Sequence, residues 1–492
     1  MGLVGTALLV ALVFGACDDE VAPEPPKSGN LPPESFLLVE SESLAPILYR
    51  VPLRWFGSDA DGQVAAFRHR WTCDSLASGT CPQSGWVETT ALADTFTVYV
   101  PGGTGEYRFE VAAVDDEGVV DPTPATQRFT LYNTPPVVSF VPNTKPTTTL
   151  PAITFYFDAV DPDSTADPED GDSRVGLWQY RGWLDGNEDA ARYVPVAEGG
   201  MTFAPEDFEG RYGTRTVYVQ ALDDGGAVSA TIEHTWQVVA PPVDGILLVD
   251  DCRMGGFLET TSDRSYRNVL GANAAGRYVV LDIETVPRLS STDLEATLSL
   301  FDRLVWYTDA DTVSSGALQL ARGGLESLLA RNGRLYLSSG LAFGTRGAFG
   351  DREAQFRDFF GIDSLYRAPN GSTNFSIALD DTVRAAVHPG LDRFRFLSLG
   401  LRAIMECFAA RQDAATQSLY FYPESTFVRA TADTLQPFVN PVQFDIGVHH
   451  ELGGGAETIY VSFPIGLPIN TNTGVNEVEI REMLRLARIL EP

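Results

Sequence analysis

The sequence predicts a multidomain protein in which two all-β sandwiches are followed by an α/β doubly wound domain. A chain of 492 residues is too long to fold around one hydrophobic core. Residues 35–241 consist of short runs with apolar side chains at alternate positions, separated by Gly, Pro and Asp, which is typical of β-sandwiches. Residues 242–492 alternate apolar strands with helical segments, which favours a sheet covered by helices. A hydrophobic content of 44% is sufficient for packed cores.

Residues 1–17 have the pattern of a signal peptide. An uncharged, apolar run covers residues 2–16 and ends at Cys17, directly before three acids. Roughly 15 apolar residues are too few to span a bilayer as a helix, and they match the hydrophobic region of a secretory signal. The ending Gly15-Ala16-Cys17 resembles the lipobox of bacterial lipoproteins, which implies that Cys17 is acylated and becomes the first mature residue. The alternative is an ordinary signal peptide with an incidental cysteine, and both predict export. The lipid anchor predicts a place in the cell envelope, either in the periplasm or at the surface.

The composition limits the possible partners. Residues 18–34 are rich in proline and predict an extended linker between the membrane and the folded part. The net charge of −31 repels phosphate backbones, so we expect no nucleic-acid partner. The expected partners are the membrane, through the lipid anchor, and an unidentified envelope protein or glycan.

The cysteines predict one disulfide. Cys73 and Cys81 flank a short, turn-rich loop, and exported proteins fold in an oxidising compartment, so we expect these two residues to be joined. Cys252 and Cys407 are far apart in the sequence. They either pair with each other or remain buried thiols.

The β region contains an internal repeat. The sequence Val114-Asp-Asp-Glu-Gly118 recurs as Leu222-Asp-Asp-Gly-Gly226, and each copy follows a strand that contains tyrosine. A period near 110 residues predicts two tandem sandwiches, over residues 35–134 and 135–241. The clearest strands of the first sandwich are expected at residues 50–56, 64–71, 95–100 and 107–114. These modules resemble the immunoglobulin-like and fibronectin type III-like domains of bacterial surface proteins.

The C-terminal half changes to an alternation of strands and helices. Parallel strands are expected at residues 245–251, 277–282, 303–308, 334–340 and 458–463. Helices are expected at residues 291–298, 317–332, 353–360 and 478–490, and residues 402–408 also have a helical pattern.

The order of these strands resembles the class I glutamine amidotransferase-like superfamily, whose sheet is flavodoxin-like. Catalytic members carry a cysteine nucleophile on a tight strand-to-helix turn, and the corresponding residues 337–341 contain no cysteine. The chain therefore resembles the non-catalytic members, which implies a non-enzymatic binding or scaffold protein. The alternative is a hydrolase or amidotransferase-like enzyme in which Ser339 acts with His449 or His450. His449 and Glu451 match the His-x-Glu spacing of catalytic members, although these residues read as the start of a hairpin loop.

Acidic residues at the ends of the predicted parallel strands are candidates for ligand binding. Asp250 and Asp251 end the first strand, Asp282 ends the second and Asp309 follows the third. Open α/β sheets bind ligands at the carboxyl ends of their strands. The alternative is that these acids cap helices and form turns.

The densest acidic loop lies in the second sandwich and is a candidate calcium site. Asp161, Asp163, Asp170 and Asp172 supply carboxylates at alternate positions. Ca²⁺ takes six to eight hard oxygen ligands, and a flexible loop can provide them. The alternative is a solvated loop, and we expect no other cofactor.

Overall fold

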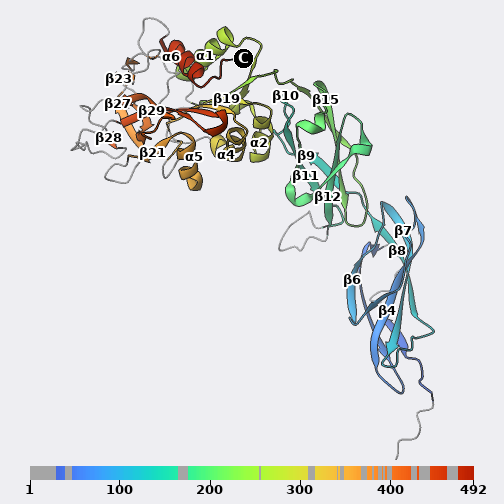
Figure 1. Ribbon diagram of the computed structural model, residues 1–492. Coiled ribbons are helices and arrows are strands. Elements are labelled where there is room, and N and C mark those ends of the chain that lie inside the picture. The colour runs from blue at the N-terminus through green and yellow to red at the C-terminus, as the bar shows by residue number, and fades with distance from the viewer. Residues whose placement is uncertain are drawn as a thin grey trace, which may run out of the picture. The chain divides into compact units, whose positions relative to one another are not determined.

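The computed structural model describes most of the chain outside its N-terminus. The described residues are 29–38, 47–164, 176–253, 256–308, 316–340, 342–343, 348–366, 374–378, 382–385, 391, 394–395, 402–422, 429–430, 444–462 and 475–491. These residues form mostly β-structure, in several sheets, with few helices (Figure 1). No helix in this part of the chain has both the length and the apolar character needed to cross a bilayer.

The chain forms two compact units. The first comprises Met1–Pro136, Asp161–Gly176 and Asp223–Val228, and the second comprises Val137–Val160, Leu177–Leu222 and Ser229–Pro492.

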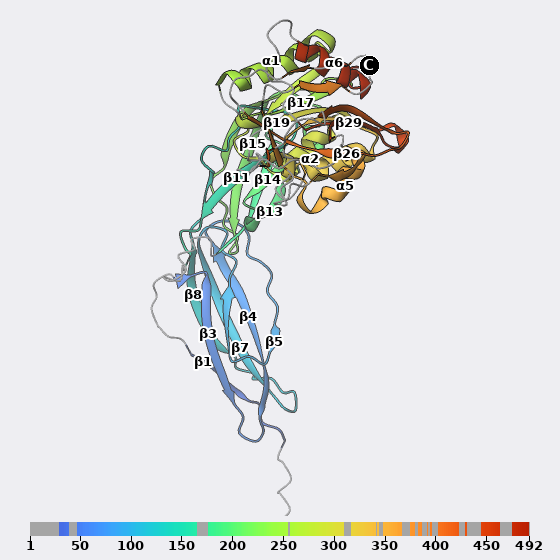
Figure 2. The ribbon, with the colours of Figure 1, turned by 90° about the vertical axis from the view of Figure 1, so that its left-hand side faces the viewer.

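The first unit contains a three-stranded and a five-stranded sheet (Figure 2). The three-stranded sheet has the order β1 (Glu34–Leu38), β3 (Arg50–Ser58) and β6 (Ala93–Thr97). The five-stranded sheet has the order β2 (Ile47–Leu48), β8 (Ala125–Asn133), β7 (Gly103–Asp115), β4 (Val64–Leu76) and β5 (Val87–Thr89). Strand β3 buries Val51, Leu53 and Trp55 and exposes the residues between them, because side chains alternate between the faces of a strand. These three side chains pack with Phe109 in one apolar core.

The second unit begins with two further sheets. One has the order β10 (Thr148–Thr149), β16 (Ile232–Val238), β15 (Gly213–Asp223), β12 (Leu177–Leu184) and β13 (Arg192–Pro195). The other has the order β14 (Gly200–Phe203), β11 (Ile153–Val160) and β9 (Val137–Phe140). Phe155, Tyr180 and Trp236 are buried in their shared core.

The repeat found in the sequence forms the same turn twice. The backbone N–H of Asp115 donates to the carbonyl of Val119, and the N–H of Asp223 donates to the carbonyl of Ala227. Both aspartates are buried.

The rest of the second unit is built on an 11-stranded sheet. Its parallel part has the order β18 (Tyr278–Asp282), β17 (Ile246–Asp251), β19 (Arg303–Thr308), β20 (Arg334–Ser338) and β30 (Glu457–Val461). The sheet continues through β29 (Phe444–Glu451), β27 (Thr416–Tyr422), β23 (Thr382–Ala385) and β24 (Phe394–Arg395), and β21 (Ile362–Leu365) joins it through β26 (Phe408–Ala410). A separate three-stranded sheet contains β25 (Arg402–Glu406), β22 (Asn374–Ala378) and β28 (Arg429–Ala430).

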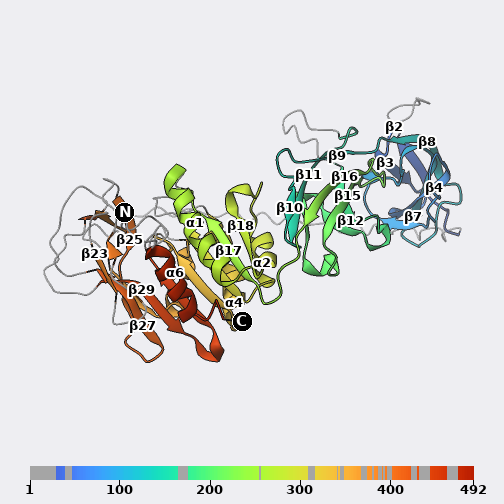
Figure 3. The same ribbon diagram turned by 90° about the horizontal axis from the view of Figure 1, so that it is seen from above.

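Helices cover both faces of the parallel strands. Figure 3 shows α1 (Gly256–Asn273) beside α6 (Val475–Leu486), and both contribute to the core on one face. Four further helices contribute to the core on the other face: α2 (Ser291–Ser299), α3 (Ala317–Leu320), α4 (Arg322–Ala330) and α5 (Glu353–Phe359). Short 3-10 helices occur at Glu188–Ala190, Val196–Glu198, Pro205–Phe208, Ile283–Thr285, Gly350–Arg352 and Gly453–Gly455.

Burial on both faces explains the continuous apolar run of the first parallel strand. In β17, Leu248 packs on the α1 side and Leu247 on the α2 side, and both are fully buried. The five strands and four helices expected from the sequence in the C-terminal half are present, although residues 317–332 divide into α3 and α4.

Two local expectations are wrong. Residues 402–408 do not form a helix but lie in β25 and β26. His449 and His450 do not lie in a loop but in β29, where they pair with Ile459 and Thr458 of β30 and are buried. In both cases, pairing with neighbouring strands decides the backbone conformation, and single-sequence patterns do not report it.

Candidate functional site

A cavity of about 350 Å³ in the second unit is the clearest candidate for a binding site. Its walls are mainly apolar and include Leu150, Ala152, Ile153, Val279, Leu281, Val286, Leu289 and Leu294. The polar lining residues include Thr148, Arg267, Asp282, Asp293 and Thr297. An apolar cavity of this size with a few polar groups is typical of small-ligand sites.

One wall of the cavity is the outer edge of strand β18. The four consecutive residues from Val279 to Asp282 line the cavity, although successive side chains point to opposite faces of a strand. Such a run lines a cavity at the edge of a sheet, and β18 is the terminal strand of its sheet within the described residues. The carbonyl of Arg277 accepts the N–H of Ile246 on β17. Alternate residues of a strand direct their backbone groups to opposite sides, so the N–H and C=O groups of Tyr278 and Val280 point away from β17.

The second wall comes from elements that precede the parallel sheet. Thr154 on β11 donates a hydrogen bond of 2.6 Å to Asp293, which lies in the first turn of α2. Burial raises the pKa of Asp293, and this hydrogen bond partly offsets the effect. The guanidinium of Arg288 lies 4.0 Å from the ring centroid of Tyr156. These contacts hold β11 against the segment that leads into α2.

A polar cluster adjoins the cavity on the α1 side of the sheet. Arg267, which also lines the cavity, lies 3.0 Å from a carboxylate oxygen of Asp250. The Tyr307 hydroxyl donates a hydrogen bond of 3.1 Å to Asp263. Burial, followed by the nearby charge of Asp250, raises the pKa of Asp263 to about 6.

The structure brings two of the four predicted ligand-binding acids together. Asp250 and Asp282 are register partners on β17 and β18, so both side chains lie on the α1 face. Asp282 also accepts the N–H of Glu284 at 3.0 Å and begins a 3-10 helix, as the capping alternative predicted. Asp251 lies on the opposite face, where it accepts the indole N–H of Trp306 at 3.3 Å. Asp309 lies outside the described residues.

Sequence reasoning missed Asp263, Arg267 and Tyr307 as members of this cluster. The first two lie on α1, which is not among the helices predicted from the sequence. The apolar residues Tyr266, Val269 and Leu270 have the spacing of a buried helix face and could have predicted it.

The residues of the alternative catalytic triad do not meet. The N–H of Ser339 donates to the carbonyl of Val461, whereas His449 pairs with Ile459 two strands away from β20. Ser339 lies beside Ser462, directly after β30 and three residues along the chain from Ile459, the partner of His449. Three residues along the strand and two spacings between strands together separate Ser339 from His449 by roughly 14 Å. The Ser339 hydroxyl instead accepts a hydrogen bond of 3.0 Å from Thr308. The separation between Ser339 and His449 is far beyond hydrogen-bond reach.

The two histidines and Glu451 have other partners. His449 contacts Glu457 at 3.3 Å, and Nδ1 of His450 lies 2.9 Å from the Thr416 hydroxyl. Glu451 is exposed, and its N–H donates to the carbonyl of Ala415. The structure therefore offers Ser339 no histidine base among these residues.

A buried carboxyl group is linked to the backbone of Ser339 through the hydroxyl of Tyr460. Glu406 is fully buried and accepts the N–H of Phe343 and the hydroxyl of Tyr460 at 2.8 Å. Burial raises the pKa of Glu406 well above its usual range, which favours the uncharged carboxyl group. The same Tyr460 hydroxyl lies 2.8 Å from the carbonyl of Ser339, so this network ties β30 to the end of β20.

Cysteine positions agree with the expected pairing. Cys73 and Cys81 form a disulfide with their Cα atoms 5.5 Å apart. Cys252 and Cys407 are buried thiols and do not form a disulfide with each other, so the second of the two alternatives holds. Cys17 lies outside the described residues.

The predicted calcium loop is described in part. The N–H of Asp163 donates to a carboxylate oxygen of Asp161 at 2.9 Å, whereas Asp170 and Asp172 lie outside the described residues. Within the described parts of the chain, no three His, Cys, Asp or Glu side chains gather as a metal-ligand set.

Comparisons with known proteins gave only weak structural similarities. No protein-family model matches the chain, and no curated protein matches it. A structure of the fibronectin(III)-like modules of Clostridium thermocellum CbhA is 14% identical, with a TM-score of 0.19, and the match covers 42% of this chain and 95% of that one. A ThuA-like protein from Bacteroides uniformis is 12% identical, with a TM-score of 0.30, and covers 51% and 93%. A two-domain fibronectin type III segment of chicken tenascin is 14% identical, with a TM-score of 0.17, and covers 42% and 99%. Similarities this low assign no function to the chain.

Proposed function

We propose that the chain is an exported, lipid-anchored binding or scaffold protein of the bacterial cell envelope, and not an enzyme. In this proposal two sandwich modules precede a doubly wound domain related to non-catalytic members of the amidotransferase-like superfamily. The observation that carries the binding function is the cavity of about 350 Å³ beside Asp282 and Arg267. The separation of Ser339 from His449 favours binding over the hydrolase alternative.

The proposed ligand is an extended segment of another envelope protein. The outer edge of β18 offers backbone donors and acceptors at Tyr278 and Val280, and a peptide strand can satisfy them by joining the sheet. A glycan has no such regular backbone pattern. The acidic chain, together with Asp282 at the cavity, favours a segment with basic side chains.

Binding by strand addition is tested with one variant and its matched control. Proline at position 280 removes an N–H that faces away from β17, so Val280→Pro blocks an added strand without breaking the β17 ladder. Val280→Thr keeps the N–H and the branched shape. The probe is a labelled decapeptide of alternating Val and Lys, measured by fluorescence anisotropy. We expect Val280→Pro to weaken binding at least about ten-fold and Val280→Thr to retain it. Equal binding by both variants would contradict the proposal.

The lipid anchor is tested at Cys17. Export is supported by the Cys73–Cys81 disulfide, since such bonds persist in oxidising compartments. Replacing Cys17 with Ser should move the full-length protein from the detergent phase to the aqueous phase in detergent partitioning. Lys27→Ala, in the predicted linker, is the control and should stay in the detergent phase. A Cys17→Ser protein that remains in the detergent phase places the anchor elsewhere.

A further inference from the structure

Three polar side chains in the first unit are buried with oxygen atoms that lack hydrogen-bond partners. Asn133, Asp161 and Asp223 are each exposed by 1% or less. Among the described residues, Oδ1 of Asn133 and Oδ2 of each aspartate have no hydrogen-bond partner. A buried polar atom without a partner is costly, and a bound ion is one way to supply the missing partner.

Asn133 and Asp223 are hydrogen-bonded to each other. Asp161 lies close to them, because Gly176, which contacts Asp161, accepts the N–H of Asp224 at 2.8 Å. Nδ2 of Asn133 donates to Oδ1 of Asp223 at 3.2 Å and to the carbonyl of Val100 at 2.8 Å. Oδ1 of Asp223 also accepts the N–H of Ala227, and Oδ1 of Asp161 accepts the N–H of Asp163. Hydrogen bonds thus hold one oxygen of each aspartate in place, whereas the other oxygen is buried without a hydrogen-bond partner.

A glycine permits the close approach of the backbone to this cluster. A Cβ atom at Gly176 would overlap Oδ2 of Asp161 and would lie 3.2 Å from the Arg50 guanidinium. The φ angle of Gly176 is +108°, a conformation that other residues rarely adopt.

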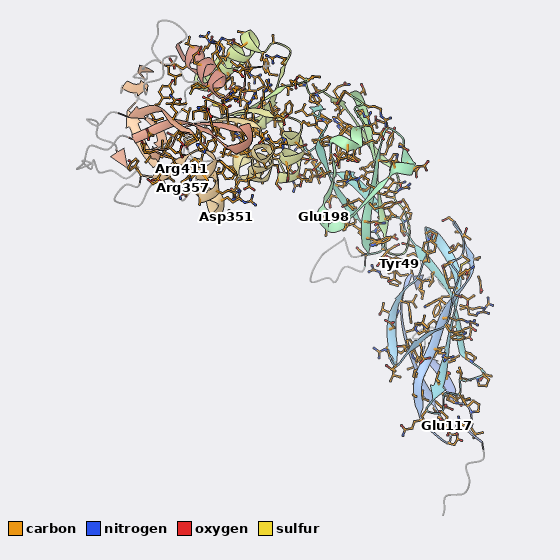
Figure 4. All side chains as sticks on the ribbon, in the orientation of Figure 1. Tyr49, Glu117, Glu198, Asp351, Arg357 and Arg411 are labelled. Carbon is orange, nitrogen blue, oxygen red and sulfur yellow. A yellow bond between two sulfur atoms is a disulfide. The ribbon has the colours of Figure 1, made fainter. Side chains whose placement is uncertain are left out.

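The charges around the cluster do not balance. Asp224 is neutralised locally, because Arg50 lies 2.6 Å from one of its oxygens and the Tyr49 hydroxyl donates to the other at 2.7 Å. Tyr49 is labelled in Figure 4. Three carboxylates, those of Asp161, Asp223 and Asp224, share the one guanidinium of Arg50, and Asp163 adds a further negative charge near Asp161.

The repeated turn of the chain provides an internal comparison. Asp115 occupies the same place in its turn as Asp223, but both of its oxygens have partners. Oδ1 accepts the N–H groups of Glu117 and Val119, and Oδ2 accepts Nδ2 of Asn30 at 2.6 Å. A carboxylate oxygen without a hydrogen-bond partner is therefore not a general property of this turn, and Asp223 differs from Asp115 in this respect.

We propose that Asn133, Asp161 and Asp223 bind a calcium ion. Two carboxylate oxygens and one amide oxygen are hard ligands of the kind that Ca²⁺ prefers, and a divalent cation would offset the excess negative charge of the cluster. Water and further oxygens would complete the six to eight ligands. Only Asp161 belongs to the set predicted from the sequence, since Asn133 and Asp223 come from the ends of β8 and β15. This site is separate from the cavity of the proposed binding function.

The proposal is tested by calcium titration of the full chain after removal of metal with EDTA. We expect a dissociation constant of roughly 10⁻⁴ to 10⁻³ M by calorimetry, as in extracellular calcium modules, and a rise in thermal midpoint with added Ca²⁺. Asp223→Asn should weaken binding at least about ten-fold. The matched control, Asp115→Asn, lowers stability but should retain the calcium response.

A second measurement does not depend on the folding of the aspartate variants. Terbium(III), a calcium substitute, emits when a neighbouring tyrosine transfers excitation energy to it. We expect Tb³⁺ emission from the unaltered protein, its displacement by Ca²⁺, and weaker emission from Tyr49→Phe with the calcium affinity retained. Absence of calorimetric heat at 10 mM Ca²⁺, an equal response to Mg²⁺, or Tb³⁺ emission unaffected by Ca²⁺ would each overturn the proposal.

Discussion

Nε2 of His449 lies 3.3 Å from a carboxylate oxygen of Glu457 across the antiparallel pair of β29 and β30. Glu457 also lies 2.8 Å from Arg488, so the carboxylate, which is 1% exposed, has two basic partners. Burial lowers the pKa of His449, and the charge of Glu457 offsets this only in part. Burial therefore favours the uncharged imidazole of His449 beside the Glu457 carboxylate.

This pair predicts an acid-sensitive contribution to stability. The pKa of His449 is lower in the folded chain than its usual value of about 6.5, so below that pH the unfolded chain binds a proton that the folded chain does not. Stability is therefore lost as the pH falls below about 6.5. His449→Gln should reduce the slope of unfolding free energy against pH between 7.5 and 5.5, measured by denaturant titration. Glu451→Gln, an exposed neighbour, is the control, and equal slopes in all three proteins would refute the prediction.

Asp263 predicts a pH dependence of opposite sign. Its pKa is raised from 3.8 to about 6 in the folded chain, so the folded state binds more protons than the unfolded state between these values. Stability is present below about pH 4 and is lost as the pH rises through about 6. Asp263→Asn keeps an acceptor for Tyr307 and removes the repulsion from Asp250, so it should stabilise the protein at pH 7.5 but not at pH 4. The gain is less than about 1 kcal/mol, because solvent screens a half-buried group.

The control for Asp263 is Asp302→Asn, since Asp302 is 77% exposed and pairs only at the surface with Arg331. A loss of stability in Asp263→Asn at pH 7.5 would show that the Asp263 carboxylate is favourable in the folded protein.

The Cys73–Cys81 disulfide should stabilise the first unit. The two residues are separated by 8 positions in the chain. Closing such a loop in the unfolded chain reduces its entropy by an amount worth about 2.5 kcal/mol. Replacing both cysteines with Ser should lower the unfolding free energy of this unit by about that much. Non-reducing peptide mapping of the unaltered protein should recover the linked pair, and two alkylated cysteines would contradict the pairing.

Ser339 should have no role in glutamine hydrolysis. Its hydroxyl accepts a hydrogen bond from Thr308, and His449 lies roughly 14 Å away by strand spacing. We expect background turnover in an ammonia-release assay, both for the unaltered protein and for Ser339→Ala. Turnover that disappears in Ser339→Ala or His449→Ala would make the protein an enzyme.

Much of the fold followed from local patterns in the sequence. The run from Ile246 to Asp251 is apolar because both of its faces are covered, and such a run predicts a central parallel strand. The alternating residues of β3 likewise predict a half-exposed strand. The repeated Asp115 and Asp223 turns are local hydrogen-bonded motifs, so their similarity was visible in the sequence.

Tertiary contacts decided what local patterns left ambiguous. The segment Arg402–Glu406 has a helical pattern but pairs with β22 as a strand. His449 lies in a strand because it pairs with Ile459 of β30. Strand pairing joins distant segments, and its energy exceeds the small differences in intrinsic propensity.

The sequence by itself determined the five parallel strands, most of the helices, the disulfide partners and the carboxyl-end positions of Asp250 and Asp282, because each depends on nearby residues or on regular periodicity. Only the tertiary structure decided that Asp251 lies on the opposite face, that Ser339 is separated from His449, and that Asn133, Asp161 and Asp223 lie together. These relations depend on register and on contacts between residues far apart in the chain. The sequence gives the chemical type of each side chain, but strand register and sheet packing determine the distances between side chains that a site requires.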